Sequence, residues 1–311
     1  MLNSNKNKIR KILSILLTFW IPIKSYRRAF RGIIQFGIKN YFNVLKTDSI
    51  TKFENELAIG AIMKDEGPYL KEWLDFHILI GVNKFYLYDN ESTDNTKEIL
   101  KPYIDKGIVE YHFIPGKGMQ YTAYSEILAQ HSNDCRWIAF IDLDEFLFSV
   151  NHKNIVEYLH TIKQDFAVLV VSWVLYGSSG HIRQPKGLIT ENYKYHRKNP
   201  SGVKSIVNPR LILNLRIHIC HVAGFIIDGN GKKLGRIDQE NNPPSIDNIR
   251  INHYVTKSKE EFEKRIKRGG GVHGPDSNYI KKKQQKFIWY NTDTVYDDIM
   301  DKYIPILKKQ K

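Results

Sequence analysis

The sequence predicts an α/β fold in which helices flank a mostly parallel central sheet. Short apolar runs, typical of buried strands, alternate four times with segments whose apolar residues repeat at helical spacing. Polar residues, several of them acidic, follow the ends of these runs. The expected strands are 57–63, 84–88, 108–113 and 137–141. Such an order favours parallel strands joined by right-handed crossovers, with a ligand crevice at their carboxyl ends.

Helix signals separate the expected strands. A helix is expected to begin at Pro68, because proline suits the first helical turn, and to stop at Gly81. A second helix follows residues 89–96, and Pro102 is expected to kink or end it. A third helical stretch lies near residues 123–130.

The most informative feature is an acidic cluster, Asp142-Leu143-Asp144-Glu145, at the end of the apolar run 137–141. Two carboxylates one residue apart at a strand end can hold a hard divalent cation, Mg²⁺ or Mn²⁺, against a diphosphate. A strand that ends in an acidic turn gives the same pattern, so this motif needs support from other parts of the chain.

A second acidic segment, Asp89 to Thr96, follows the strand expected at 84–88. Asp89 stands at the strand end, where a carboxylate can accept hydrogen bonds from a ligand. The alternative is that Asp89 begins a turn. Asp94 is expected to have a structural role at the start of the next helix, where aspartate is a favoured cap.

Together these segments resemble a family 2 type GT-A glycosyltransferase, which has a Rossmann-like fold. More narrowly, the chain is similar to the bacterial relatives of glycosyltransferase family 92. The resemblance covers roughly residues 57–270. It rests on segments 63–66, 72–77, 88–94, 140–146, 173–180, 204–207 and 251–258, which occur in the family's order.

The resemblance implies a UDP-sugar donor and a divalent cation, Mn²⁺ or Mg²⁺. Asp144 is then the direct metal ligand, and Asp142 contacts the ribose or reaches the metal through water. Glu145 orients a neighbour or is structural.

The resemblance also places donor-binding residues outside the acidic cluster. The position of Asp89 reads the nucleotide in related transferases, which suggests uridine. Lys64, Glu66 and Lys204 are further candidates for contact with the nucleotide sugar, and Arg210 is another candidate for contact with an anion.

His253 is the candidate for a third metal ligand. It precedes a marked helix start, where Ser258 and Glu261 fit a capping box. In several GT-A enzymes a late histidine completes the metal shell or touches the diphosphate, and imidazole is an acceptable ligand for Mn²⁺. A structural role for His253 is the alternative.

A basic segment follows His253. Lys257, Arg265, Lys267 and Arg268 precede the glycines at 269–271, and the segment could close over the leaving diphosphate. A solvated basic helix face is the alternative for each of these residues.

The acceptor is expected to meet the segment 173–180, read as a strand that ends in a Gly/Ser loop. Trp173, Gly177 and Ser178 are the candidates, because such a loop brings an aromatic face and backbone groups close to a sugar. Trp173 fits a core position equally well.

Inversion at the anomeric carbon needs a general base across the sugar from the diphosphate. Asp228 and Glu191 are the candidates, with Asp238 a third. Asp228 is preferred because it ends the apolar run 222–227 and opens a Gly-rich turn.

The chain is expected to have three parts. Residues 1–56 form a basic, amphipathic, membrane-associating segment. Residues 57–270 form the GT-A domain, with a nucleotide-sugar half at 57–150 and an acceptor half at 151–270. Residues 271–311 form a basic helical extension.

Charge and hydropathy place the protein at a membrane surface. The formal net charge is +14, and residues 1–48 are rich in Lys and Arg. The uncharged run between Lys11 and Lys24 is too short to span a bilayer, which takes about 20 residues. A basic, aromatic-rich segment lying on anionic lipid fits better, at the cytoplasmic face of the plasma membrane.

Two other classes compete with this interpretation. The basic charge allows a nucleic-acid-binding protein, but no nucleic-acid-binding motif is recognisable, so no nucleic acid partner is expected. A nucleotidyltransferase would usually carry a Gly-rich phosphate loop after the first strand, and 63–67 is not one. The two cysteines form no CxxC pair, so a structural zinc site is not expected. The resemblance and the N-terminal segment together therefore imply an inverting transferase that moves a sugar to a lipid-linked or oligosaccharide acceptor in capsule, lipopolysaccharide or exopolysaccharide synthesis.

Overall fold

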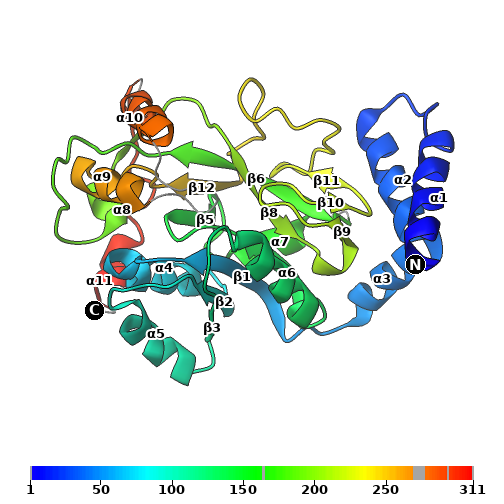
Figure 1. Cartoon of the computed structure of the whole chain (residues 1–311), viewed down its shortest axis with the longest axis horizontal. Helices are drawn as coiled ribbons and strands as arrows, with labels where there is room; N and C mark the ends of the chain where they lie inside the picture. The colour runs from blue at the N-terminus through cyan, green and yellow to red at the C-terminus, as the bar shows by residue number, and fades with distance from the viewer. Residues whose placement is uncertain (1, 163–164, 269–276, 293, 310–311) are drawn as a thin grey trace.

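The computed structural model describes residues 2–162, 165–268, 277–292 and 294–309 (Figure 1). The first half of the central sheet alternates strands with helices, as the sequence predicts. Its elements are β1 (Asn55–Met63), α4 (Gly67–Leu79), β2 (Lys84–Asp89), α5 (Thr96–Asp105), β3 (Val109–Phe113), α6 (Gln120–His131) and β4 (Cys135–Phe140). β1 pairs in parallel with both β2 and β4, and β2 pairs in parallel with β3. This doubly wound order, β3-β2-β1-β4, places the carboxyl ends of β1, β2 and β4 at one edge.

The second half of the sheet is mixed. It contains β5 (Glu145–Ser149), β6 (Val168–Leu175), β8 (Val203–Val207), β11 (Ile226–Ile227) and β12 (Ile249–His253). β8 lies antiparallel between β4 and β6, β12 runs parallel to β6, and β5 pairs antiparallel with β12. The fold is therefore α/β, and its sheet is parallel in most of its pairs, with three antiparallel pairs from β4 onward: β4 with β8, β8 with β6, and β12 with β5.

Helices cover both faces of the parallel half. Alternate residues of β1, Leu57 and Ile59, face the core cluster that contains Trp73 of α4. Ala58 points to the opposite cluster, which contains Ile127 of α6. This alternation along one strand fixes a core on each side of the sheet.

The helix boundaries agree with the expected signals in one case and differ in another. Pro68 lies in the first turn of α4, and Gly81 follows the helix with φ +105°, a left-handed conformation that glycine adopts readily. Pro102 does not end α5, which continues to Asp105. Tyr103 and Ile104 pack against the core, and this tertiary packing holds the turn that follows the proline.

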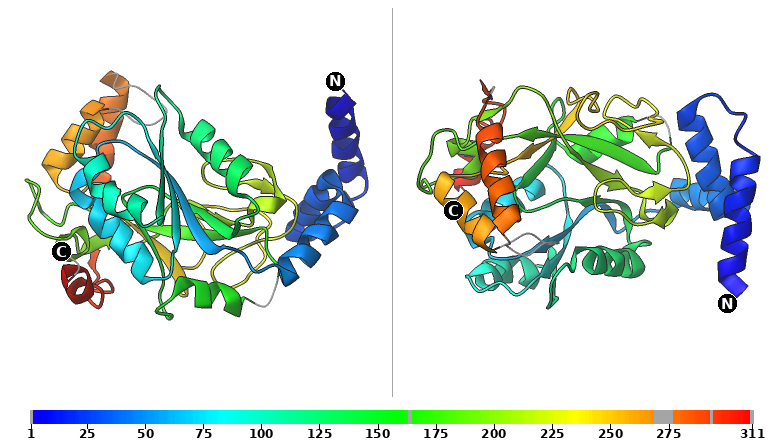
Figure 2. Two further views of the ribbon diagram at one scale, coloured as in Figure 1. Left: turned by 90° about the horizontal axis from the view of Figure 1, so that it is seen from below. Right: turned by 45° about the horizontal axis from the view of Figure 1, so that its top comes forward.

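Three helices precede the sheet: α1 (Leu2–Leu16), α2 (Lys24–Phe36) and α3 (Ile38–Ile50). Figures 1 and 2 show α1 and α2 side by side at one end of the molecule. α2 lies against β10 (His221–Val222), so closely that a Cβ on Gly32 would meet the backbone oxygen of Val222 at 2.1 Å. Asp48 of α3 accepts a hydrogen bond from Arg210 Nε at 2.7 Å. Among the described residues, no helix combines the length and the apolar character needed to span a bilayer.

The C-terminal helices also pack against the rest of the chain. The remaining elements are α7 (Ile155–Thr161), α8 (Ile189–Asn192), β7 (Tyr195–Arg197), a 3₁₀ turn (Pro209–Leu211), β9 (Ile212–Asn214), α9 (Lys259–Arg268), α10 (Ser277–Tyr290), β13 (Thr294–Tyr296) and α11 (Ile304–Lys309). Phe262 of α9 packs on Phe287 of α10, and Tyr303 beside α11 packs on Phe76 of α4. Packing therefore continues across the expected boundaries at residues 56 and 270, and the three-part division stays a prediction about function.

Candidate functional site

Three strands bring the acidic cluster together with His253. Asp142 follows β4, and the chain turns so sharply that Glu145 already begins β5, with its N–H donating to the Asp142 carbonyl at 3.1 Å. β12 pairs antiparallel with β5 in a register that sets His253 opposite Glu145. The pairing of distant strands therefore places the late histidine beside the acid cluster.

Asp144, Glu145 and His253 offer ligand atoms that all lie within 4.8 Å of one another, and all three side chains are buried. His253 Nε2 is 3.4 Å from Asp144 Oδ1, and His253 Nδ1 is 4.0 Å from Glu145 Oε1. In the described part of the chain, neither ring nitrogen of His253 nor Glu145 Oε1 has a hydrogen-bond partner. Buried polar atoms are normally paired. The cluster thus offers two carboxylates and an imidazole, and Glu145 Oε1 and both His253 nitrogens lack a hydrogen-bond partner among the described residues. This ligand set fits a divalent cation such as Mn²⁺.

Lys204 of β8 bridges the same cluster from the other side. Its Nζ lies 2.9 Å from Asp142 Oδ2 and 3.7 Å from Glu145 Oε1, and its side chain is 1% exposed. Burial alone would lower the pKa of Lys204, but the two carboxylates raise it above its ordinary value. Burial raises the pKa of Glu145 well above its usual range, although Lys204 opposes that rise. Lys204 is thus a fixed cation inside the site.

Arg265 of α9 provides a second cation. Its Nη1 donates to Asp144 Oδ2 at 2.9 Å and to the Val255 carbonyl at 2.9 Å. Burial favours a raised pKa for Asp144, but Arg265 and then His253 outweigh it and hold that pKa well below its usual range. Asp144 is therefore kept ionised in a buried place.

The predicted capping box at the start of α9 is confirmed. The Ser258 N–H donates to Glu261 Oε2 at 3.1 Å, and the Glu261 N–H donates to Ser258 Oγ at 3.3 Å. This cap fixes where α9 begins and thereby aims Arg265 at the acid cluster.

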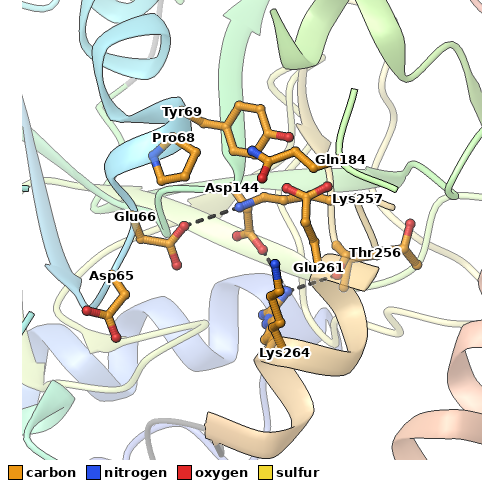
Figure 3. Close-up of a pocket in the computed structure, with 12 residues that line it drawn as sticks. Asp65, Glu66, Pro68, Tyr69, Asp144, Gln184, Thr256, Lys257, Glu261 and Lys264 are labelled. Carbon is orange, nitrogen blue, oxygen red and sulfur yellow. Dashed lines mark hydrogen bonds and ion pairs between the residues drawn. The ribbon is translucent and has the colours of Figure 1, made fainter. Parts of the chain in front are cut away.

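A pocket of about 410 Å³ opens beside Asp144. Figure 3 shows Glu66, Lys257 and Asp144 around this space, with Lys264 on the helix below. Arg265 of α9 also lines the pocket. Lys257 Nζ is 3.2 Å from Glu66 Oε2 and lies 4.8 Å from the centre of the Tyr69 ring. The pocket thus carries both signs of charge beside the acid cluster.

The loop after β2 is ordered by its own acidic residues. Asp89 accepts hydrogen bonds from the Ser92 N–H at 2.8 Å and from Tyr111 Oη at 2.8 Å. Asp94 accepts from Thr96 Oγ1 at 2.6 Å and from the Gly67 N–H at 2.9 Å, so it starts α5 and ties it to α4. Asp94 has the expected structural role. The nucleotide role of Asp89 stays a prediction, since one of its oxygens holds the turn and the other accepts from Tyr111 of β3. Lys64 lies in the adjoining turn after β1.

The acceptor candidates divide into two places. The Trp173 ring lies 4.7 Å from the His253 ring, and its buried Nε1 has no hydrogen-bond partner in the described residues. Ser178 donates from N–H and Oγ to Asn291 Oδ1, both at 2.8 Å, and a Cβ on Gly177 would meet the same oxygen at 2.8 Å. Trp173 therefore joins the site, whereas residues 177–178 pack against the end of α10.

The structure does not bring the base candidates to the cluster. Asp228 Oδ1 accepts from the N–H groups of Asn230 and Lys232, both at 2.9 Å, in a turn after β11. β11 pairs with the beginning of β6, whereas the cluster lies near its other end. Glu191 forms an ion pair of 2.6 Å with Lys308. Asp238 accepts hydrogen bonds within its own exposed turn.

Two residues with a clear role in the structure could not be singled out from the sequence patterns. Lys283 of α10 comes from a run of three lysines, and burial, Arg265 and Lys286 lower its pKa to about 8 while Asp144 opposes the shift. Lys283 thus shares the field of Asp144 and Arg265. Glu72 of α4 is buried and accepts from the N–H groups of Ile189 at 2.6 Å and Thr190 at 3.0 Å, which fixes α8 against the core.

Comparison with known proteins shows the family to which the chain belongs. A family model described as glycosyltransferase family 92 matches residues 64–285, well over half of the 311 residues. The match assigns the chain to the glycosyltransferases. More narrowly, the chain belongs to glycosyltransferase family 92.

The curated relatives are plant proteins. A family 92 protein of Ricinus communis is 29% identical over 171 residues, which cover 54% of this chain and 31% of the relative. One of Arabidopsis thaliana is 26% identical over 208 residues, which cover 61% of this chain and 36% of the relative. The chain thus spans about a third of the length of these relatives.

Solved structures show weaker likeness. S. aureus TarS in complex with UDP-GlcNAc has a TM-score of 0.37 and 12% identity, covering 75% of this chain and 71% of TarS. Glucosyl-3-phosphoglycerate synthase from Mycobacterium tuberculosis, in complex with Mn²⁺, UDP and glucosyl-3-phosphoglycerate, has a TM-score of 0.27 and 20% identity. That match covers 38% of this chain and 44% of the synthase.

Proposed function

We propose that this protein transfers a sugar from a UDP-sugar to a glycan acceptor and uses Mn²⁺ or Mg²⁺ to do so. The observation that carries the proposal is the buried cluster of Asp144, Glu145 and His253, in which Glu145 Oε1 and both ring nitrogens of His253 have no hydrogen-bond partner among the described residues. It lies at the carboxyl end of β4, the edge at which doubly wound sheets bind nucleotides. It also lies inside the region that matches family 92.

In this proposal Asp144, Glu145 and His253 hold the cation. When bound, that cation neutralises charge on the leaving diphosphate. Lys204 keeps Asp142 in place for the ribose or for a water at the metal, through their ion pair of 2.9 Å.

The pocket beside Asp144 receives the diphosphate. Lys257 and Arg265 line it, and Lys283 lies in the same electrostatic field. Fixed cations aimed at the place where negative charge grows lower the barrier to bond cleavage. Lys64 and Glu66 in the turn after β1 contact the donor, and Asp89 contacts the uridine.

Transfer inverts the anomeric centre, and Trp173 offers the acceptor an aromatic face beside His253. The acceptor is a growing cell-surface glycan, lipid-linked or oligosaccharide, of the capsule, lipopolysaccharide or exopolysaccharide type. That acceptor class rests on the resemblance to bacterial members of the family, while the curated relatives are plant proteins.

A screen of UDP-sugars for hydrolysis, with and without Mn²⁺, tests the proposal. We expect turnover of at least one UDP-sugar with Mn²⁺, and its loss in Asp144→Asn. Asp105→Asn is the matched control, because Asp105 is 59% exposed and lies on α5. Equal hydrolysis by Asp144→Asn and the parent, or turnover that ignores the metal, would contradict the proposal.

The proposed location is the cytoplasmic face of the plasma membrane, reached through the N-terminal helices. Phe19 and Trp20 are 67% and 68% exposed, and several Ile and Leu residues of α1 are also exposed. Ser14 of α1 and Thr18, in the turn after α1, contact Gln35 and Arg31 of α2. The apolar residues therefore remain available for lipid, beside cations that attract an anionic surface.

Sedimentation with vesicles tests the membrane contact. We expect the full-length protein to pellet with anionic vesicles, less so at high salt, and Phe19→Ser/Trp20→Ser to pellet less. Phe113→Ser/Ile182→Ser is the control, because those residues are 60% and 72% exposed on other surfaces. Equal pelleting of both double variants would contradict a membrane contact through Phe19 and Trp20, in the turn after α1.

A further inference from the structure

A second group of potential ligands lies away from the candidate active site. Glu110 and His112 are two residues apart on β3, so their side chains lie on the same face of the strand. His131 ends α6, which packs over that face. β3 is separated from β4 by two strands, a distance of about 14 Å at about 4.8 Å per strand.

Two imidazoles converge on one carboxylate oxygen in this group. His112 Nε2 is 3.0 Å from Glu110 Oε1, and His131 Nε2 is 3.2 Å from the same oxygen. The three donor atoms all lie within 4.8 Å of one another. Two ligands that bind zinc at about 2.0–2.1 Å in a tetrahedral arrangement stand about 3.4 Å apart. The two distances from Glu110 Oε1 to the histidine nitrogens, 3.0 and 3.2 Å, are therefore already close to the spacing that one zinc ion would impose.

Neighbouring side chains fix the orientation of the His112 and His131 rings. His131 Nδ1 lies 3.1 Å from Asp134 Oδ2, and the His131 ring stacks on Tyr86 at 3.9 Å between centroids. The His112 ring stacks on Tyr88 at 4.6 Å. A carboxylate on the far ring nitrogen is the usual partner of a metal-binding histidine, since it fixes the tautomer and the ring orientation.

Carboxylates face both ring nitrogens of His131, Asp134 at Nδ1 and Glu110 at Nε2. The buried Nε2 has no hydrogen-bond partner among the described residues, although Glu110 Oε1 lies 3.2 Å away. A cation shared with Glu110 and His112 would give this nitrogen a partner.

We propose that Glu110, His112 and His131 form a binding site for a divalent transition metal of the zinc class. Two imidazoles and one carboxylate are a ligand set that zinc accepts, and it leaves a fourth position for water. The side chains of Glu110 and His112 are 34% and 29% exposed, so solvent reaches that position. The metal fastens β3, at the edge of the sheet, to the end of α6.

Zinc titration of the full-length protein after removal of metal with EDTA tests this site, with a chromophoric zinc indicator as competitor. We expect His112→Gln/His131→Gln to bind one equivalent of Zn²⁺ fewer than the parent. His160→Gln is the matched control, because His160 Nε2 also lies 3.0 Å from a carboxylate, that of Glu56. This control should bind as the parent does.

The variant Asp134→Asn is a second test, and it leaves all three proposed ligands in place. Loss of the carboxylate behind a metal-binding histidine typically weakens metal affinity 10–100-fold, and we expect a loss in that range. An equivalent of Zn²⁺ that is lost in Asp144→Asn belongs to the candidate active site. The proposal is overturned if both His112→Gln/His131→Gln and Asp134→Asn bind Zn²⁺ like the parent, or if Asp144→Asn alone removes all binding.

Discussion

Replacing Lys204 with methionine is expected to lower the free energy of unfolding by about 3–5 kcal/mol, the usual cost of breaking a buried ion pair from one side. Lys204 is 1% exposed and Glu145 is fully buried, so the variant leaves the Glu145 carboxylate without its cation. An exposed pair gives the contrast. Lys101 and Asp105 are 73% and 59% exposed and form an i, i+4 pair, so Lys101→Met should cost about 0.3–0.5 kcal/mol at most.

Urea unfolding followed by tryptophan fluorescence, in EDTA, measures these losses. The double variant Lys204→Met/Glu145→Gln should recover much of the stability, because removing both partners of a buried pair is far less costly than removing one. Burial already raises the pKa of Glu145. An acid with a raised folded-state pKa binds more protons when folded, so stability falls as pH rises above the unfolded value. The deficit of Lys204→Met should therefore be larger at pH 8 than at pH 5. A loss no greater than that of Lys101→Met would refute the reasoning.

Three further predictions address the core, the cap and the donor. His77 accepts from the Leu147 N–H on Nε2, and burial lowers its pKa to about 3. The unfolded state therefore binds the extra proton, and between pH 7 and pH 5 the parent should lose about 2 kcal/mol more stability than His77→Gln, measured by urea unfolding. Ser258→Ala should cost about 1 kcal/mol through loss of the α9 cap, and an unchanged denaturation midpoint would count against that cap. Asp89→Ala should weaken UDP binding by about 1–3 kcal/mol in calorimetry, and unchanged affinity would leave Asp89 to the turn alone.

The parallel half of the fold could be predicted from local patterns. The apolar runs that became β1 to β4 and the proline and glycine signals around α4 act over a few residues, so the sequence displays them directly. β5 could not be seen in this way. An acidic cluster is typical of a turn, and only the pairing of β12 shows that Glu145 already belongs to a strand.

The same reasoning explains which site residues could be expected. Asp144 follows a recognisable strand, and the capping box locates the start of α9. Asp228 ends an apolar run as clearly as Asp142 does, but the strand before it pairs with the beginning of β6. The edge of the sheet that a strand end joins is decided by long-range pairing. Lys283 is one of three consecutive lysines, and only the packing of α10 shows that it is the one near Asp144 and Arg265.

Calorimetric titration of UDP in the presence and absence of Mn²⁺ tests the central claim most directly, because it measures the metal-dependent donor site without any acceptor. The parent and Asp105→Asn should bind UDP more tightly with Mn²⁺ than without it. Asp144→Asn should keep its circular dichroism spectrum and lose the Mn²⁺-dependent gain, since a neutral amide is a poor ligand in place of a carboxylate. An Asp144→Asn variant with the same Mn²⁺-dependent affinity as the parent would contradict the account.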